Sequence, residues 1–171
     1  VHSGRALRRD GAQPGDDLWV SGQAGLAALG LAQLQARTKL PDALAKRCIS
    51  ALQRPLPRVE LGLALRERAL AHSAIDVSDG LLADLGHIGE RSGLAAAVQL
   101  IQLPHLRELA GSGESYDADR RRLALECQLT GGDDYELCFT TPPAQAQAVG
   151  QIATRLDLPL CLAAIGASVI A

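Results

Sequence analysis

Carboxylates and a hydroxyl gather at residues 74–82 (Ala-Ile-Asp-Val-Ser-Asp-Gly-Leu-Leu), where a predicted strand runs directly into a predicted helix. The apolar residues before the junction suit a short buried strand, and those after it recur at helical spacing. The first amides of a helix have no partner within the helix and carry partial positive charge, so they hold anions well. The junction is therefore a candidate site for phosphate, with Asp76, Ser78 and Asp79 as its polar side chains.

Two aspartates at one helix start also indicate a metal ion. They repel a bare phosphate, so the arrangement makes electrostatic sense when a hard cation stands between carboxylate and phosphate. Oxygen ligands without adjacent His or Cys suit Mg²⁺, which proteins usually hold with one or two carboxylates plus substrate phosphates. The alternative is that Ser78 or Asp79 is an ordinary N-cap worth roughly 1 kcal/mol, and that Asp76 only ends a strand.

A second acidic cluster lies at residues 130–139 (Thr-Gly-Gly-Asp-Asp-Tyr-Glu-Leu-Cys-Phe), where a glycine pair precedes three acids and a strand-like run. The glycines let the backbone turn sharply and approach a ligand closely. Crowded carboxylates are costly unless a cation or a donor-rich ligand neutralises them. The alternative is a solvated turn, because Gly-Gly-Asp-Asp is also a common loop sequence.

Together these motifs carry a resemblance. Residues 74–81, followed by residues 130–139, resemble the C-terminal domain of thiamine-monophosphate kinase, within the wider family that includes aminoimidazole-ribotide synthetase and selenophosphate synthetase. Residues 4–16 (Gly-Arg-Ala-Leu-Arg-Arg-Asp-Gly-Ala-Gln-Pro-Gly-Asp) resemble the segment that opens this domain. Three matches in the right order cover nearly the whole chain.

The resemblance implies an enzyme that transfers the terminal phosphoryl group of ATP to thiamine monophosphate with the help of Mg²⁺. In that scheme Asp76 and Asp79 hold Mg²⁺, Ser78 hydrogen-bonds the nucleotide phosphate, and Arg9 contacts the nucleotide. Asp133 meets thiamine monophosphate, although the family commonly has the longer glutamate there. The attacking phosphate oxygen is already anionic near pH 7, so no residue is assigned as general acid or base.

The resemblance also implies missing parts. The kinase family has a preceding domain that forms a homodimer and much of the nucleotide site, so we expect residues 1–17 to be an entry loop or linker and residues 18–171 to be the C-terminal domain of a two-domain kinase. We expect this portion to be inactive alone. The family's C-terminal aromatic residue, which packs on thiamine, has no counterpart before Ala171.

Two other functions stay open. One is another ATP-using enzyme of the wider family, similar to aminoimidazole-ribotide or selenophosphate synthetase. The other is a non-catalytic nucleotide-binding domain that keeps the site as a sensor.

Composition narrows the class of protein. A chain of 171 residues with 47% hydrophobic and 21% charged residues suits one globular domain. A net charge of −2 and 2% aromatic residues argue against nucleic-acid binding, and no apolar stretch approaches the roughly 20 residues of a membrane span. Four scattered cysteines without a C-x-x-C pair indicate buried reduced thiols and hence a cytoplasmic protein.

Strands alternate with helices along the chain, and some helices occur in succession. This order predicts an α+β fold with helices packed on a mixed sheet, like the C-terminal domain of the aminoimidazole-ribotide synthetase family. The predicted strands are residues 18–22, 74–77, 94–103, 137–140 and 160–165, and the predicted helices are 25–36, one starting at 41–47, 59–71, 81–91, 106–109, 119–127 and 144–156.

Three further residues have structural interpretations. Trp19 lies in a predicted strand, so we expect it to pack in the core rather than to stack on a ligand. His72 is expected to cap the C-terminus of the helix before it. His87 is expected to be a half-exposed surface residue of the central helix.

Overall fold

Four strands form the central sheet of the protein, as seen in a computed structural model. They are β1 (Asp17–Ser21), β2 (Ser73–Val77), β4 (Glu136–Thr141) and β5 (Leu160–Ile165), in the order β2-β4-β1-β5 across the sheet. A separate two-stranded sheet pairs β3 (Leu94–Ala95) with β6 (Ser168–Val169). The structure describes residues 6–99, 103, 118–165 and 168–169.

Six α-helices accompany the sheets in the described part of the chain. They are α1 (Leu26–Leu34), α2 (Asp42–Gln53), α3 (Val59–Glu67), α4 (Leu81–Ser92), α5 (Ala118–Thr130) and α6 (Ala146–Arg155), with a short 3-10 turn, η3 (Pro143–Gln145), before the last. The predicted α+β class is confirmed. The described strand pairs are all antiparallel, so the expected mixed character of the sheet is not observed.

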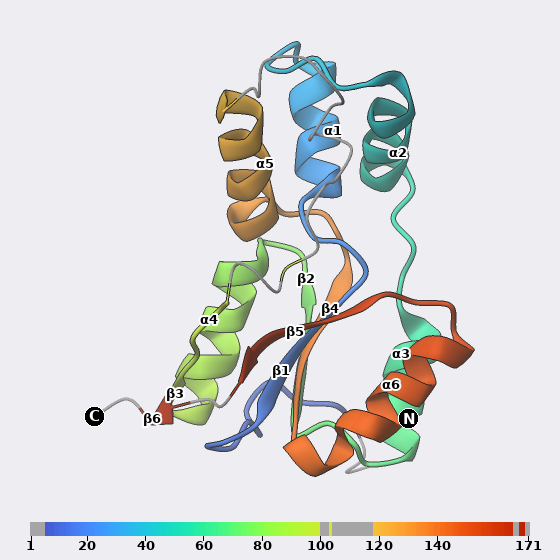
Figure 1. Cartoon of the computed structure of the whole chain (residues 1–171). Helices are drawn as coiled ribbons and strands as arrows, with labels where there is room; N and C mark the ends of the chain where they lie inside the picture. Colours follow the sequence, from blue (N-terminus) through green and yellow to red (C-terminus); the bar gives the residue numbers. More distant parts are fainter. Residues whose placement is uncertain (1–5, 100–102, 104–117, 166–167, 170–171) are drawn as a thin grey trace.

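Each face of the sheet is covered by different helices (Figure 1), because successive side chains of a strand point to opposite faces. On one face α4 packs Leu85 and Ile88 against Val20 and Val77. On the opposite face α3 and α6 enclose Phe139, which is completely buried. Burying these apolar side chains is the main force that holds the helices on the sheet.

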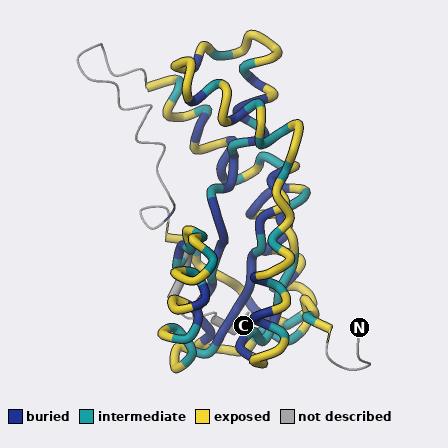
Figure 2. The backbone as a smooth tube through the Cα atoms, turned by 90° about the vertical axis from the view of Figure 1, so that its right-hand side faces the viewer, coloured by how far each residue is buried: buried dark blue, intermediate teal, exposed yellow. Residues whose placement is uncertain are grey.

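A layer of three helices, α1, α2 and α5, stands beyond one end of the sheet (Figure 1). Its core is a cluster of its own, with Leu29 from α1, Leu44 and Cys48 from α2, and Ala124 and Cys127 from α5. Figure 2 shows buried backbone running through the interior of both this layer and the sheet, with exposed segments outside. The loops that leave β1 and β2 and the loop that enters β4 connect the sheet to α1, α4 and α5.

Several element boundaries differ from the sequence prediction. Of the strand expected at 94–103, β3 forms at its start and residues 96–99 are not in a strand, because this run of alanines has low strand propensity. Residues 100–102 lie outside the described residues. The helix expected at 59–71 ends at Glu67, and Ala69 then adopts a left-handed backbone with φ of 50°. Conversely, α2 continues to Gln53. The short helix expected at 106–109 lies outside the described residues.

Trp19 contributes to the core, as predicted. It packs, half-buried, against the cluster under α3 and α6, and its indole Nε1 donates a hydrogen bond to Thr141 Oγ1 at 3.0 Å. The four cysteines of the chain are all buried and none forms a disulfide, which confirms the prediction of buried thiols. Burial raises the pKa of the Cys138 thiol to about 12, so this sulfur stays protonated and unreactive.

Candidate functional site

The two acidic motifs lie side by side at the end of the sheet that faces the three-helix layer. Val77, the last residue of β2, pairs with Glu136, the first residue of β4. Beyond this pair the loops stay in contact, because Asp133 N donates to Ser78 O and Tyr135 N donates to Val77 O, both at 2.9 Å. Residues more than fifty positions apart in sequence are thereby joined in one polar surface.

Glycine allows this close approach. A side chain at Gly132 would overlap the carbonyl oxygen of Ser78, and one at Gly80 would come within 2.8 Å of the Thr130 backbone. Gly80 also has a φ of 118°, a conformation that other residues rarely adopt. The glycines of both motifs are thus required by the contact between the two loops, as the sequence suggested for the Gly-Gly pair.

A buried carboxylate holds the first loop. Asp84, in the first turn of α4, is 2% exposed, and its Oδ2 accepts hydrogen bonds from the backbone amides of Ser78, Asp79 and Gly80 at 3.0, 3.0 and 3.2 Å. These three amides belong to the loop and to the N-cap, because α4 begins at Leu81. The internal acid Asp84 therefore holds the loop that leads into the helix.

The side chains around this loop remain available to a ligand. Asp76, Asp79 and Asp133 are exposed, and Ser78 is half-buried. Side chains along a strand alternate between the two faces of the sheet, so Asp76 lies on the same face as Ala74. Asp79 lies beyond the end of β2, just before the start of α4. Exposed carboxylate oxygen atoms are the ligands that a hard cation prefers. Among the described residues, the ligand atoms that lie within 4.8 Å of one another belong to Asp79, Asp84 and His87, and this group does not include Asp76 or Asp133.

Arg9 lies away from this group. Its neighbour Arg8 accepts a hydrogen bond from Ala74 N through its carbonyl oxygen, which fixes the segment near the beginning of β2. Ser78 follows Ala74 by four positions, a span of roughly 13 Å at about 3.3 Å per residue of strand. The Arg8 side chain pairs with Asp10, and Arg9 is exposed.

Asp134, unlike its neighbour Asp133, points inward and caps another helix. Its carboxylate is 9% exposed and accepts hydrogen bonds from Gly25 N at 2.5 Å and Ala27 N at 3.1 Å, at the start of α1. It therefore ties the acidic loop to the three-helix layer. Burial raises the pKa of Asp134 to about 6, although the two amide hydrogen bonds oppose the shift.

This pKa predicts a pH-dependent stability. The folded state binds the Asp134 proton more tightly than the unfolded state, whose ordinary value is 3.8, so stability falls as pH rises from about 4 to about 6. The loss is at most about 3 kcal/mol for a shift of roughly two pKa units. Thermal unfolding between pH 4 and 7 should show Asp134→Asn gaining stability relative to wild type as pH rises. Asp42→Asn, an exposed change at the start of α2, should show no such gain.

Glu136 is also buried and forms an ion pair beneath the loop. It is 6% exposed and accepts two hydrogen bonds from the Arg58 guanidinium, from Nε at 2.7 Å and from Nη2 at 2.6 Å. Ser21 Oγ donates to the same carboxylate at 2.6 Å and accepts from Leu137 N at 2.8 Å. The hydrogen bonds to Glu136 raise the pKa of Arg58 further above its ordinary value. The network fixes the start of β4 beside the end of β1.

Sequence reasoning missed these supporting residues. An acid in the first turn of a helix is a weak signal that could have marked Asp84, and Arg58 shows no local pattern that predicts a distant partner. His72 was interpreted wrongly. Because α3 ends five residues earlier, His72 is not its cap; its Nδ1 lies 2.8 Å from Oδ1 of buried Asp16.

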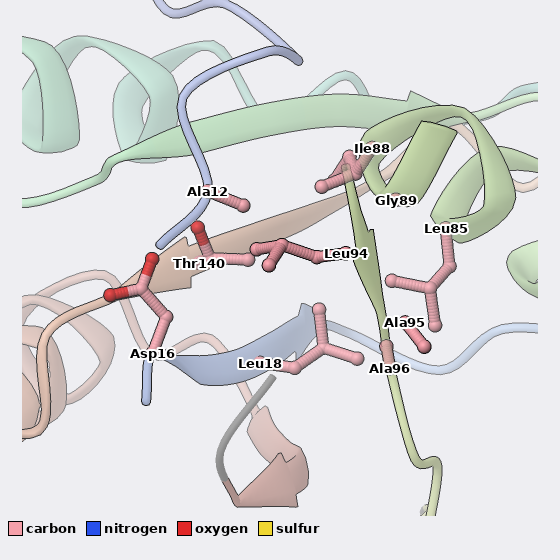
Figure 3. A pocket seen from close by; sticks show the side chains of 10 residues that line it. All are labelled: Ala12, Asp16, Leu18, Leu85, Ile88, Gly89, Leu94, Ala95, Ala96 and Thr140. Atoms are coloured by element: carbon pink, nitrogen blue, oxygen red, sulfur yellow. The ribbon is translucent and has the colours of Figure 1, made fainter. Parts of the chain in front are cut away.

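An apolar hollow lies elsewhere along α4. Its walls combine Leu85 and Ile88 with Leu18 and Leu94, and Asp16 and Thr140 bring oxygen atoms to one side (Figure 3). Ile88 is more than two turns from the acidic loops, and the lining carries one carboxylate. The hollow therefore does not belong to the candidate site.

Several solved structures share the fold of this chain. PurLQS from Thermotoga maritima shares the fold, with a TM-score of 0.61 and 19% identity over 99% of this chain and 24% of that one. Thiamine-monophosphate kinase from Stenotrophomonas maltophilia K279a has a TM-score of 0.85 and 47% identity, over 99% of this chain and 52% of that one. AaThiL complexed with AMPPCP and TMP has a TM-score of 0.72 and 28% identity, over 96% of this chain and 48% of that one.

Sequence comparison agrees. Thiamine-monophosphate kinase from Escherichia coli K12 is 44% identical over 160 residues, which are 93% of this chain and 47% of that protein. No family model matches the chain. The resemblance read from the three motifs is confirmed: the chain is similar to thiamine-monophosphate kinases over nearly all of its length, and it spans about half the length of the curated relatives it matches. Among the helices that the structure describes, none has the length and apolar content of a bilayer-crossing segment.

Proposed function

We propose that this chain is the C-terminal part of a kinase that phosphorylates thiamine monophosphate to thiamine diphosphate with ATP. The observation that carries the proposal is the meeting of the two acidic motifs, which gathers Ser78, Asp79 and Asp133 on one surface. The relatives named thiamine-monophosphate kinase, and the complex of one ThiL with AMPPCP and TMP, support the choice of substrates.

The exposed oxygen atoms of Asp76 and Asp79 fit Mg²⁺, and these two residues are the proposed ligands. When bound between carboxylates and phosphates, Mg²⁺ supplies charge neutralisation and a template for in-line transfer. Ser78 is the proposed hydrogen-bond donor to the nucleotide phosphate, at the point where its backbone is held by Asp84 and Asp133. Asp133, exposed on the facing loop with a φ of 67°, is the proposed contact to thiamine monophosphate.

Chemistry at this site rests on position and charge. The acceptor is a phosphate oxygen that is anionic near pH 7, so the transfer needs no strong general base. A rigid loop lowers the cost of aligning the two phosphates, and the three amide bonds to Asp84 supply that rigidity. Arg9 remains the proposed nucleotide contact. Because its segment lies near the beginning of β2, this contact requires the nucleotide to extend from the acidic loops along β2.

The rest of the site is proposed to come from a further domain. The chain spans about half of its relatives, so an N-terminal domain, which also forms a homodimer, completes the nucleotide site in the proposed enzyme. This portion alone is then inactive. The cytoplasmic location stays a prediction from four cysteines that form no disulfide.

The test is product formation by the full-length protein that contains this chain. Incubation with ATP and thiamine monophosphate should yield thiamine diphosphate only when Mg²⁺ and both substrates are present. ATP hydrolysis with an aminoimidazole precursor instead would identify a sister enzyme of the wider family. Nucleotide binding without any turnover would identify a sensor domain.

A further inference from the structure

The loop that carries Asp133 has a strained backbone. Asp133 and Tyr135 have φ of 67° and 52°, in the left-handed region that residues other than glycine seldom adopt. Such conformations persist only where the surrounding structure fixes the backbone firmly. The position of the exposed Asp133 side chain therefore depends on the groups that anchor this loop.

Two buried acids provide the anchors. Asp134 caps the start of α1, and Glu136, three positions after Asp133, binds Arg58. Both carboxylate oxygens of Glu136 take part, because Oε2 accepts from Arg58 Nε at 2.7 Å and Oε1 accepts from Nη2 at 2.6 Å. Two parallel hydrogen bonds to a planar guanidinium fix the direction of a carboxylate as well as its place. Arg58 thus sets the geometry of the second anchor.

A glycine at the end of β1 makes room for this anchor. Gly22 directly follows β1 and has a φ of 58°. A Cβ atom at residue 22 would lie 1.9 Å from Oε1 of Glu136 and 2.6 Å from Oε2, so the carboxylate occupies the space that a side chain would fill. The carboxylate can therefore be displaced in two independent ways, by a change at Arg58 and by a change at Gly22.

We propose that Arg58 is a positioning residue for the substrate: through Glu136 it holds Asp133 in place to contact thiamine monophosphate. This inference rests on the proposed function, in which Asp133 makes that contact. The residues proposed to bind Mg²⁺ and the nucleotide phosphate have a separate anchor, because Asp84 holds the loop at residues 78–80. Loss of the Glu136 anchor should therefore weaken the use of thiamine monophosphate and spare the use of ATP.

Steady-state kinetics of the full-length protein, with each substrate varied in turn, test this inference. Arg58→Gln removes the charge and the paired hydrogen bonds, and Gly22→Ala places a methyl group where the carboxylate lies. Each should raise the KM for thiamine monophosphate by at least about tenfold, whereas the KM for ATP and kcat stay within about twofold of wild type. A purely structural role of the pair would reduce the amount of folded enzyme, which lowers the apparent kcat and changes neither KM.

Two control variants match these substitutions. Arg54→Gln changes an exposed arginine four positions before Arg58. Gly93→Ala adds a methyl group at a similar φ of 68°, but there the space around it is open. Both controls should keep the wild-type KM values for the two substrates.

The outcomes separate this inference from the proposed function. If wild type forms thiamine diphosphate and the KM for thiamine monophosphate is unchanged in either variant, the role of Arg58 is refuted and the kinase proposal stands. An equal rise in the KM for both substrates would also refute it, because the effect would not be specific to the loop that carries Asp133. Absence of product from wild type would refute the proposed function, and this inference with it.

Discussion

Replacing Asp84 by alanine is expected to lower the free energy of unfolding by roughly 3–5 kcal/mol, because it removes a buried charged acceptor from three backbone amides at once. Hydrogen bonds to charged groups are worth more than neutral ones, and amides that lose their partner in a closed site gain little from water. The Ser78–Gly80 loop should loosen at the same time.

Urea unfolding of wild type and variants measures this effect. Asp84→Asn keeps one carbonyl oxygen as acceptor and should cost less than Asp84→Ala. Glu90→Gln, an exposed change on the same helix, should stay within about 0.5 kcal/mol of wild type. A loss below about 1 kcal/mol for Asp84→Ala would show that the three amides find other partners and that Asp84 does not hold the loop.

Breaking the ion pair between Arg58 and Glu136 is expected to cost about 2–4 kcal/mol, because Arg58→Ala leaves the Glu136 carboxylate buried without its cation. The Arg58 side chain is 23% exposed, so water compensates for part of the loss. Ser21 remains as one donor to the carboxylate.

A double-mutant cycle separates the pair from other effects of the substitutions. Glu136→Gln in the Arg58→Ala background removes the unpaired charge, so the double variant should recover part of the stability lost in Arg58→Ala. Arg54→Ala, an exposed arginine four positions earlier, is the matched control and should change stability by less than about 0.5 kcal/mol. Additive single changes would mean that Arg58 and Glu136 do not interact in solution.

The parts of the fold that follow local patterns were predictable from the sequence. At residues 74–82 a short apolar run is followed by apolar residues at helical spacing, and this change predicts a strand-to-helix junction. The structure has β2 and α4 there. Pairing between strands has no such local signal. The sequence therefore yielded the α+β class but not the antiparallel partnership of β2 with β4, which is what joins the two acidic motifs.

In the candidate site, too, local patterns were predictable from the sequence and long-range contacts were not. Spacing identified a cluster of acids at 133–136, but only the fold decides that Asp133 is exposed while Asp134 caps α1 and Glu136 binds Arg58. Likewise, Asp84 looks like any acid in a first helical turn until the backbone of the preceding loop closes around it. Burial and long-range partners, rather than residue type, separate the supporting acids from those left for a ligand.

The most direct test of the central claim, that the junction at residues 76–79 works in magnesium-assisted phosphoryl transfer, is thiamine-diphosphate formation by the full-length Asp79→Asn variant over a range of Mg²⁺ concentrations. The substitution removes the charge and keeps the size of the side chain. We predict a rate at least about 100-fold below wild type, because the loss of a metal ligand at the transferring phosphates costs several kcal/mol of transition-state stabilisation. Equal rates and equal Mg²⁺ dependence of variant and wild type would contradict the account.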